Sequence, residues 1–516
     1  MRAMLNINPD HLIEHLQTLT DSSAKVSADS RQIRSGDIFF AYPVGHGKAR
    51  RDGRPFIDAA LQNGAAAVVF DPNEMGDAYL EHPQCYAIEN LAERAGQYCA
   101  EWYGNPSKQL KIIGVTGTNG KTSITQWLAH ALNKPGHRTA VLGTLGTGFP
   151  GELEKTGYTT PDAPKLQTQL KELLVAGAKQ VAMEVSSHAL DQERIAGTWF
   201  NCAVFTNLTQ DHLDYHETMA NYAQTKAKLF SQQGLEHAVV NLEDAFGREL
   251  VMNLLARNDL QVWAYALDRS AFNGFEKFGN RLQRIYAENV AFQHAGYDAE
   301  FIHEGVNKTP LHIPLLGKFN LSNALAVWTT LLTQGLNGEE ASKLISQLQP
   351  VVGRMELIAN GKSAKFDGPL AVVDYAHTAD ALQKALEALR SIANERGGKL
   401  WCVFGCGGDR DIGKRPQMGA VAAKFADEII VTSDNPRSED PHAIIEMIGK
   451  GIPASFTTIQ KVADRAAAIM AAIRHADKRD VVLVAGKGHE TVQEINGKSF
   501  EFSDQEHIRL AARGLI

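Results

Sequence analysis

The chain has 516 residues, a formal net charge of −7 at pH 7, 44% hydrophobic residues and 22% charged residues. This length is too great for one hydrophobic core and favours about three or four domains of an ordinary globular protein. No apolar run approaches the ~20 residues of a membrane span, residues 1–16 are polar and unlike a secretory signal, and the negative charge argues against a nucleic-acid partner.

Residues 1–105 are typical of a small α/β unit. Apolar runs at 37–42 and 65–70 predict strands, and residues 55–64 between them predict a helix that ends at Gly64. Residues 103–108 contain Gly and Pro, and we expect them to form a linker to the next unit.

Residues 112–123 are the most informative segment of the chain. A short apolar run is followed by Thr-Gly-Thr-Asn-Gly-Lys-Thr at 116–122 and then by a helix-compatible run. A strand, a Gly-rich turn and a helix start form a phosphate-binding loop, in which Lys121 contacts the β/γ-phosphates and Thr122 ligates Mg²⁺. The loop is a variant, because Val115 stands where the usual motif has its first Gly. An ordinary Gly-rich turn is the alternative.

The remaining chain alternates predicted strands with helical segments. Strands are expected at 139–143, 180–185, 202–206, 237–241, 370–374, 400–405, 428–432 and 480–485, and helices at 166–174 and 219–230. This rhythm indicates mostly parallel sheets that are covered on both faces. We therefore predict an α/β protein of three domains: a smaller N-terminal α/β domain (1–105), a central domain with a P-loop ATPase-type, mostly parallel sheet (106–350) and a Rossmann-like α/β domain (351–516).

Six of these predicted strands run directly into polar or Gly-rich residues, at 184–188, 206–208, 374–377, 405–410, 433–437 and 486–490. Ligands of open α/β sheets bind beyond the carboxyl ends of the strands. We expect two sheets to face one another across a cleft. The alternative, that loops are simply polar, explains one or two such ends more easily than six.

Several side chains at these strand ends suit metal binding. Glu184 could share Mg²⁺ with Thr122, although a lone Glu is more often a partner of a helix N-cap. Four such side chains lie within residues 211–216, and they either bind a metal or cap a helix: Asp211, His212, Asp214 and His216. Lys226, on a predicted helix, is by itself most simply a solvated lysine.

Taken together, these motifs resemble the Mur ligases, ATP-dependent amide-forming enzymes of peptidoglycan synthesis. The motifs that carry the resemblance are residues 116–122, Glu-Val-Ser-Ser-His at 184–188, Thr-Asn-Leu-x-x-Asp-His-Leu-Asp-Tyr-His at 206–216, Tyr-x-x-x-Lys at 222–226, Gly-Arg-Met-Glu at 353–356, Asp-Tyr-Ala-His at 374–377 and Gly-Lys-Gly-His-Glu at 486–490. Asp-Ser-Arg at 29–31 with Gly-Asp-Ile-Phe-Phe-Ala at 36–41 resembles the uridine-nucleotide domain of the family. The resemblance therefore covers nearly the whole chain.

The resemblance implies ATP and Mg²⁺ as cofactors and an acyl phosphate as the intermediate. It places ATP on Gly117, Thr118, Asn119, Gly120, Lys121, Thr122, Ser123, Asn320, Arg354 and Asp374. Thr122 and Glu184 would hold one Mg²⁺, and His212 with a carbamylated Lys226 would hold a second. Lys121, Lys226 and His212 would thus be the catalytic residues. Carbamylation needs a neutral amine, so the pKa of Lys226 must lie below its usual value of about 10.4.

The resemblance also implies a substrate, UDP-N-acetylmuramoyl-L-alanyl-D-glutamate. Its uracil end would be held by Ser30 and His46, although the run at 44–53 around His46 is longer than the family pattern. Ala28 is a further implied contact of this substrate. Its muramoyl-peptide part would be held by Thr159, Thr160, Ser186, Gln192 and Arg194. Residues 159–162 can also be interpreted as a polar turn before a helix.

Asp-Asn-Pro-Arg at 434–437 resembles the signature of the branch that adds meso-diaminopimelate. Arg437 offers a planar fork for the second carboxylate of this amino acid, and Arg410 is a second candidate. The other implied contacts are Asp434, Asn435, Pro436, Gly486 and Glu490, with Glu490 pairing with the distal ammonium. If lysine left Arg437 unpaired, the pocket could discriminate by ~10⁴ or more. The alternative is an Arg437 bound only to Glu439 or Asp440.

We therefore predict a cytoplasmic, monomeric ligase that acts on small molecules and binds neither nucleic acid nor membranes. Five scattered cysteines, with Cys402 and Cys406 spaced unlike a Cys-x-x-Cys pair, fit reduced core thiols in that compartment. A folate polyglutamate ligase shares the ATP-site plan, but residues 29–31 and 434–437 argue against it. A nucleotide-switched binding module is the other alternative, and no segment resembles a switch.

Overall fold

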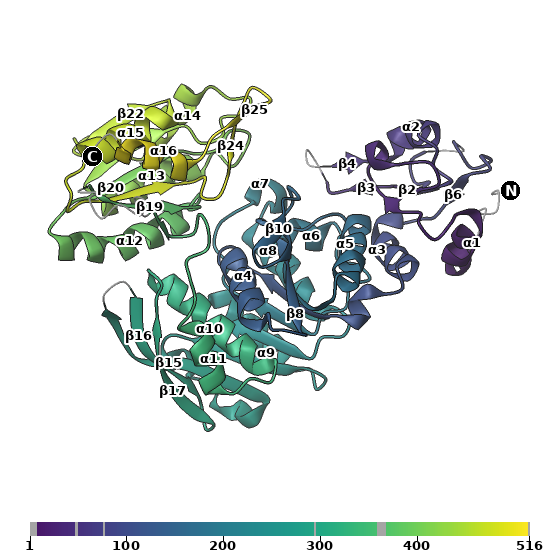
Figure 1. Ribbon diagram of the computed structural model, residues 1–516, viewed down its shortest axis with the longest axis horizontal. Coiled ribbons are helices and arrows are strands. Elements are labelled where there is room, and N and C mark those ends of the chain that lie inside the picture. Colours follow the sequence, from purple (N-terminus) through teal and green to yellow (C-terminus); the bar gives the residue numbers. More distant parts are fainter. Residues whose placement is uncertain (1–7, 47–49, 76–77, 294–295, 359–367, 514–516) are drawn as a thin grey trace.

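The computed structural model describes residues 8–46, 50–75, 78–293, 296–358 and 368–513. Its three large sheets lie in a row, with the N-terminal and C-terminal sheets at opposite ends and the largest sheet between them (Figure 1). Residues 1–7, part of the segment we compared with a secretory signal, lie outside the described residues. Within the described ranges, no helix combines the length and the apolar character that a bilayer crossing requires.

The N-terminal sheet is parallel, with strand order β1-β2-β5-β6. These strands are β1 (Val26–Ser27), β2 (Ile38–Ala41), β5 (Ala67–Phe70) and β6 (Cys85–Ala87). Alternate residues of β2 point to opposite faces, so Ile38 and Phe40 pack on α1 (Leu12–Leu19) and α3 (Leu91–Trp102), whereas Phe39 packs on α2 (Ile57–Gln62). The predicted strands and the helix that ends near Gly64 are confirmed.

The segment that we expected to be a linker is packed against the central sheet. Pro106–Gln109 form a 3₁₀ helix (η5), and Ser107 is buried. The Ser107 hydroxyl accepts a hydrogen bond of 3.1 Å from the backbone N–H of Trp199. The segment 103–108 thus connects α3 to β7 (Lys111–Thr116), and a side-chain contact with a residue 92 positions away fixes its second half.

The central sheet is built around six parallel strand pairs. In spatial order its strands include β8 (Arg138–Gly143), β11 (Ala178–Glu184), β7 (Lys111–Thr116), β12 (Cys202–Phe205), β13 (His237–Asn241), β14 (Gln261–Ala266) and β15 (Leu282–Gln293). Helices α4 (Lys121–Leu132) and α10 (Lys318–Thr333) cover one face, and α5 (Ala163–Val175) and α9 (Ala245–Leu254) cover the other. The prediction of a mostly parallel sheet covered on both faces is confirmed.

Antiparallel strands extend both edges of this sheet, which the sequence analysis did not predict. On one side β9 (Gly146–Phe149) and β10 (Glu152–Glu154) follow β8, and on the other β16 (Gly296–His303) and β17 (Asn307–Ile313) follow β15. Helix α11 (Gly338–Ile345) packs against β17.

The C-terminal sheet has the order β18-β19-β23-β20-β21-β22 and is parallel except for β18. Its strands are β18 (Glu356–Leu357), β19 (Leu370–Asp374), β20 (Leu400–Phe404), β21 (Glu428–Thr432), β22 (Ile459–Val462) and β23 (Val481–Ala485). Helices α12 (Ala379–Arg396), α13 (Lys414–Phe425) and α14 (Pro441–Gly449) cover one face, and α15 (Arg465–His475) and α16 (Asp504–Arg513) cover the other. The domain boundaries at 105 and 350 stay a prediction.

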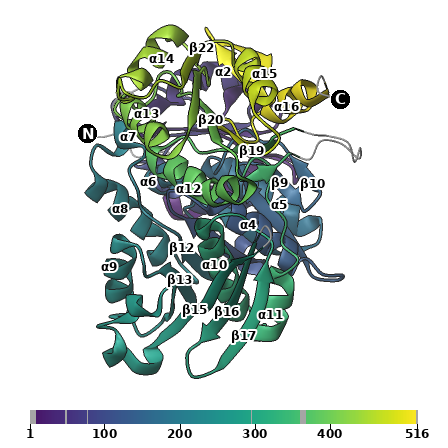
Figure 2. The ribbon, with the colours of Figure 1, turned by 90° about the vertical axis from the view of Figure 1, so that its left-hand side faces the viewer.

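The carboxyl ends of the central and C-terminal strands meet, as predicted. In Figure 2, α12 and α13 lie above α10 of the central part. His377, beyond β19, has its Nε2 3.7 Å from an oxygen of Asp211, and the Asn119 amide donates to Asp380 over 3.4 Å. A cavity of about 260 Å³ between the two parts is lined by Gln210 on the central side and by Asp380, Gln383, Lys414 and Gln417 on the other.

Candidate functional site

The loop between β7 and α4 has backbone conformations that require glycine. Gly117 has φ +148° and Gly120 has φ +90°. A Cβ atom on Gly117 would lie 1.8 Å from the Thr206 hydroxyl oxygen, and one on Gly120 would lie 2.6 Å from Oδ1 of Asn323. The loop thus turns tightly into the start of α4, where backbone N–H groups and the helix dipole favour a phosphate.

Lys121 lies inside this loop and folds back onto it. Its Nζ donates to the carbonyls of Gly117 (2.7 Å) and Thr118 (2.9 Å). Burial lowers the pKa of Lys121, partly offset by the negative charges of Glu184 and Asp211. The ammonium therefore already lies where the anionic part of a nucleotide would fit.

Thr122 and Glu184 are brought together as predicted for a Mg²⁺ site. The Thr122 hydroxyl donates to Glu184 Oε2 over 2.9 Å, and Glu184 is fully buried at the end of β11. Thr144, which the sequence analysis missed, donates its N–H to Glu184 Oε1 over 2.8 Å and its hydroxyl to Oε2 over 3.2 Å. Thr144 directly follows the predicted strand 139–143, so the strand-end rule that found Glu184 could have found it.

The donor chemistry of this pair fits Mg²⁺, which prefers carboxylate and hydroxyl oxygens and keeps water or phosphate oxygens as further ligands. Within the described ranges, no group of three or more His, Cys, Asp or Glu side chains is arranged to hold a metal ion. Protein side chains alone would thus supply only part of a coordination shell here.

Lys226, on α8 (Met219–Ala227), is a buried lysine next to the phosphate loop. Its Nζ donates to the Gly117 carbonyl over 2.9 Å and lies 4.4 Å from the centre of the Tyr222 ring. Burial and the nearby charge of Lys121 lower the pKa of Lys226 well below the usual 10.5. A neutral amine is the form that CO₂ carbamylates, so the environment fits the expected carbamate.

His212 and Asp211 lie beside these lysines. His212 Nε2 is 3.3 Å from an oxygen of Asp211, and the ring packs edge-on to His188. Burial among protein groups lowers the pKa of His212 to about 3, yet 42% of its side chain is exposed, so a ligand can still reach the neutral ring. Burial would raise the pKa of Asp211, but the adjacent imidazoles of His377 and His212 outweigh it and lower that pKa.

Arg354 reaches from the C-terminal part into the nucleotide loop. Its Nη2 donates to the Thr122 hydroxyl over 3.2 Å, and the guanidinium lies 4.3 Å from the centre of the Tyr375 ring. Its Nε is buried, and no acceptor in the described part of the chain reaches it. A buried donor without a partner is costly, and a phosphate oxygen would satisfy it.

The other predicted nucleotide residues lie nearby but are held by the protein. Asp374 accepts the Met355 N–H over 2.7 Å, and burial raises its pKa. Asn320 donates to the Leu316 carbonyl over 2.9 Å. Asn323, one helical turn later and missed by the sequence analysis, approaches Gly120 more closely.

The residues predicted to hold the muramoyl-peptide part are gathered beside Glu184. The Thr160 hydroxyl donates to the Glu184 carbonyl (2.8 Å), and Arg194 donates to the Thr160 carbonyl (2.8 Å) and to Oε1 of Gln192 (3.0 Å). The remaining two join the same group: Thr159 pairs with the Thr144 hydroxyl at 3.0 Å, and Ser186 caps α6 (Ser187–Asp191). The alternative of a polar turn before a helix also holds, since Asp162 caps α5.

The predicted uracil residues divide between two places. Ser30 is buried and Ala28 is half-buried, and both lie in the segment that follows β1 in the N-terminal part. His46 instead reaches the central part, where its Nε2 lies 3.0 Å from the Tyr215 carbonyl and its Nδ1 3.6 Å from Asp191. Residues 47–49 of the long run at 44–53 lie outside the described residues.

Arg437 has partners that the sequence analysis did not foresee. Its Nη1 donates to the Gly408 carbonyl over 2.8 Å, and its Nε lies 3.2 Å from Glu494 Oε2. Glu439 pairs with Arg415 instead. Asp440 is not a partner of Arg437 either. Glu494 would remain beside Arg437 if lysine were bound, which lowers the discrimination to be expected from an unpaired guanidinium. Arg410 is exposed close by, and its Cγ lies 3.7 Å from a Cβ built on Gly407.

Asp434, Asn435, Gly486 and Glu490 converge beside Arg437. A Cβ on Gly486 (φ +112°) would lie 2.6 Å from Asp434 Oδ2, so the two loops touch. The Asn435 amide donates to Glu490 Oε2 over 2.8 Å. Pro436 lies between Asn435 and Arg437 in the chain, and its carbonyl is close to Gly408. The predicted amino-acid residues thus form one group.

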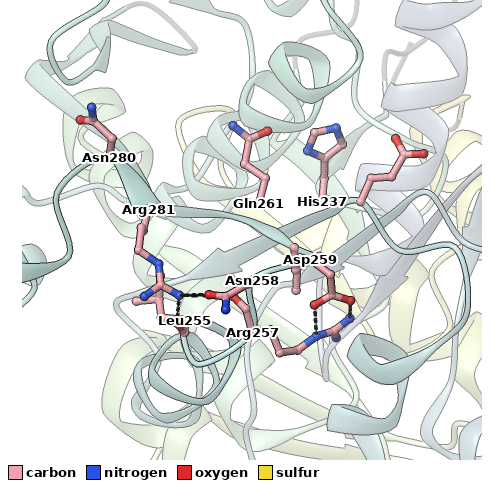
Figure 3. A pocket seen from close by; sticks show the side chains of 10 residues that line it. His237, Leu255, Arg257, Asn258, Asp259, Gln261, Asn280 and Arg281 are labelled. Atoms are coloured by element: carbon pink, nitrogen blue, oxygen red, sulfur yellow. Dashed lines mark hydrogen bonds and ion pairs between the residues drawn. The ribbon is translucent and has the colours of Figure 1, made fainter.

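A second polar cavity, of about 430 Å³, lies at the opposite edge of the central sheet, where β13 and β14 begin (Figure 3). Its arginines are already bound within the protein. Arg257 pairs with Asp259 at 2.8 Å, and Arg281 donates to Asn258 over 3.3 Å. We assign no ligand to it.

Comparison with sequence families gives two matches. Residues 115–331 match the Mur ligase middle domain, and residues 353–488 match the Mur ligase, glutamate ligase domain. The chain is also 48% identical, over 98% of its length and 96% of the relative, to UDP-N-acetylmuramoyl-L-alanyl-D-glutamate--2,6-diaminopimelate ligase from Ralstonia nicotianae.

Among solved structures, a UDP-N-acetylmuramoyl-L-alanyl-D-glutamate--2,6-diaminopimelate ligase matches with 35% identity and a TM-score of 0.64, covering 95% of this chain and 94% of that one. The folylpolyglutamate synthase of Mycobacterium tuberculosis complexed with ADP shares the fold, with 18% identity and a TM-score of 0.58. That match covers 77% of this chain and 92% of the other.

Proposed function

The chain belongs to the Mur ligase family, and we propose that it is the ligase that joins meso-diaminopimelate to UDP-N-acetylmuramoyl-L-alanyl-D-glutamate at the expense of ATP. One observation carries this proposal: the match to a relative of that name extends over 98% of the chain, and so takes in nearly all of residues 1–105 as well as the part that contains the Asp-Asn-Pro-Arg segment. The folate ligase shares the fold over a smaller part of the chain.

The reaction has two steps. A carboxylate oxygen of the terminal glutamate attacks the γ-phosphorus of ATP, so that ADP leaves and an acyl phosphate forms. The amine of diaminopimelate then attacks the acyl carbon, phosphate leaves with the bridging oxygen, and the nitrogen loses a proton. Both steps need positive charge around the phosphates and a close approach of the two organic substrates.

The chain's own cations meet the first requirement. Lys121 and the loop N–H groups would bind the phosphates, and Arg354 would offer its unpaired Nε from the opposite side. The remaining nucleotide contacts we assign are Thr118, Asn119, Ser123, Asn320 and Asp374. Mg²⁺, held by Thr122 and Glu184, would neutralise phosphate charge as it develops.

We assign a second Mg²⁺ position to His212 and a carbamylated Lys226. Two facts support it: the amine of Lys226 is buried with a lowered pKa, and the ring of His212 is neutral and accessible. The carbamate would place an anion where the neutral amine stood, and this anion would attract the ammonium of Lys121.

The substrates would approach this centre from opposite sides. The group Thr159, Thr160, Ser186, Gln192 and Arg194 would orient the muramoyl-peptide, with Ala28, Ser30 and His46 nearer the nucleotide end. Arg410, Asp434, Asn435, Pro436, Arg437, Gly486 and Glu490 would hold diaminopimelate. We expect a monomer in the cytoplasm. The expectation of the cytoplasm is supported by the five cysteines, which are all buried and free of disulfides.

The amine substrate separates this function from its alternatives. Purified enzyme is given Mg²⁺, ATP and UDP-N-acetylmuramoyl-L-alanyl-D-glutamate, and ADP release is followed on adding meso-diaminopimelate, lysine or glutamate in turn. We expect strong stimulation by diaminopimelate alone. Stimulation by glutamate with a folate acceptor, or by none of the amines, would refute the proposal.

Changing Arg437 to lysine is expected to lower kcat/KM for meso-diaminopimelate by about 10- to 100-fold, because the bidentate, charge-assisted contact is lost. The preference of this variant for meso-diaminopimelate over lysine should be modest, since Glu494 can still neutralise the positive charge at position 437. Steady-state kinetics check this, with the KM for ATP as the internal control. Equal turnover by the two proteins would remove Arg437 from the diaminopimelate site.

A further inference from the structure

Lys487 is a fully buried lysine that the motif analysis assigned no task. It follows β23, between two glycines with positive φ, Gly486 (+112°) and Gly488 (+54°). A Cβ on Gly488 would lie 2.7 Å from both the Gly353 carbonyl and the Tyr375 side chain. The loop is therefore clamped, and its lysine points inward rather than to solvent.

The ammonium of Lys487 has two partners, both in the candidate amino-acid site. Nζ donates to Glu490 Oε2 over 2.8 Å and to Asn435 Oδ1 over 2.9 Å. Burying an ammonium is unfavourable unless such partners are present. An apolar side chain would fill the space more simply, which points to a task beyond packing.

The orientation of the Asn435 amide follows from these contacts. Oδ1 of Asn435 accepts from Lys487 and also from the backbone N–H of Glu494, over 3.0 Å. Because two donors hold Oδ1, the amide nitrogen Nδ2 lies on the other side of the group. It points to Glu490, to which it donates over 2.8 Å. Without Lys487 the amide would lose one of the two contacts that set its direction.

The protein therefore holds the Glu490 carboxylate through one of its two oxygens. Oε2 accepts from both Lys487 and Asn435, while no donor in the described ranges contacts Oε1. The Glu490 side chain is 27% exposed, whereas Lys487 is not exposed at all. The carboxylate therefore presents one oriented oxygen to a ligand and keeps the other for its support.

We infer that Lys487 is a positioning residue for amine recognition: through Glu490 and Asn435 it orients one carboxylate oxygen toward the distal ammonium of the incoming amino acid. This inference rests on the proposed function. Lys487 does not touch the substrate, and it acts by restricting Glu490 to a single rotamer, so its effect should be confined to amines that carry a second ammonium.

The test compares two amines that differ only in that group. meso-Diaminopimelate has the distal ammonium, and 2-aminopimelate keeps both carboxylates but lacks it. The wild-type enzyme should prefer diaminopimelate by about 10- to 100-fold in kcat/KM, the range of one charge-assisted hydrogen bond. Lys487→Met should reduce this preference by about 10-fold, through a higher KM for diaminopimelate. The kinetics with 2-aminopimelate should change little.

Two further variants distinguish positioning from loss of structure. Lys487→Gln keeps one donor and should retain an intermediate preference. Lys461→Met removes an exposed lysine of the same part of the chain, paired with Glu446 at 2.8 Å, and should leave the preference unchanged. If Lys487→Met does not fold, the preference of Lys487→Gln for diaminopimelate over 2-aminopimelate decides whether the inference holds. A general structural defect would weaken both amines equally.

The outcomes separate the two levels of the proposal. An unchanged preference in a folded Lys487→Met or Lys487→Gln enzyme that has a normal KM for ATP overturns the inference and leaves the proposed function standing. A wild-type enzyme that turns over neither amine refutes the proposed function and this inference with it. A preference that collapses in Lys487→Met and is intermediate in Lys487→Gln supports both.

Discussion

Replacing Lys226 with alanine is expected to reduce amide formation by about 100- to 1000-fold, the loss typical of removing one preorganised group that stabilises charge in a transition state. The buried amine lies beside Gly117 of the phosphate loop, and its lowered pKa suits conversion to a carbamate. At the proposed second Mg²⁺ position, alanine would leave His212 without its partner. Single-turnover formation of the amide, measured with saturating substrates, would give this loss directly.

Short carboxylates such as formate or acetate should partly restore the activity of Lys226→Ala, because they can occupy the space of the missing carbamate. Lys228→Ala is the matched control: it lies two residues further on, is 44% exposed and pairs with Glu193. It should retain wild-type activity. Normal activity of Lys226→Ala would show that no carbamate is needed.

The carbamate also predicts a dependence on CO₂ and pH. Only the neutral amine reacts with CO₂, and the lowered pKa of Lys226 keeps it neutral at lower pH than a solvated lysine. Enzyme depleted of bicarbonate should lose activity, and more bicarbonate should be needed for recovery as the pH falls and the amine becomes protonated. An activity that bicarbonate does not affect at any pH would contradict this.

Replacing Lys121 with alanine is the second change with a large expected effect, a loss of about 100- to 1000-fold in ADP formation. Lys121 Nζ now bonds the Gly117 and Thr118 carbonyls, so its removal both loosens the loop and takes a cation from the phosphates. Lys111→Ala, an exposed lysine at the start of β7, is the control and should behave as wild type. ADP release and ATP binding should be measured together. A variant that is normal in both would exclude Lys121 from the nucleotide site.

The strand-end rule predicted much of the site because it depends on local pattern alone. Parallel strands end at one edge, so Glu184 at the end of β11, next to β7, and Asp374 at the end of β19 could be placed near a ligand before any contact was known. The edges of the central sheet could not be predicted in this way. β15 has a register shift between Glu288 and Ala291, which disrupts the alternation of apolar and polar residues that identifies a strand.

Long-range partners are the other part that sequence reasoning could not supply. The sequence offers Glu439 and Asp440, close neighbours in the chain, as partners of Arg437, yet its carboxylate partner is Glu494 on the hairpin of β24 (Val492–Ile495) and β25 (Lys498–Glu501). Arg437 and Ile495 form a parallel bridge, which brings the hairpin to the site. His46 likewise contacts Tyr215, 169 residues away. Pairings over such separations depend on tertiary packing rather than on local pattern.

The most direct test of the account follows one oxygen atom through the reaction. UDP-N-acetylmuramoyl-L-alanyl-D-glutamate is labelled with ¹⁸O in its glutamate carboxylates and incubated with enzyme, Mg²⁺, ATP and meso-diaminopimelate, and the released phosphate is analysed by mass spectrometry. If the acid is activated as an acyl phosphate, each phosphate released with a new amide bond carries one ¹⁸O atom. Amide formation with unlabelled phosphate would contradict the mechanism.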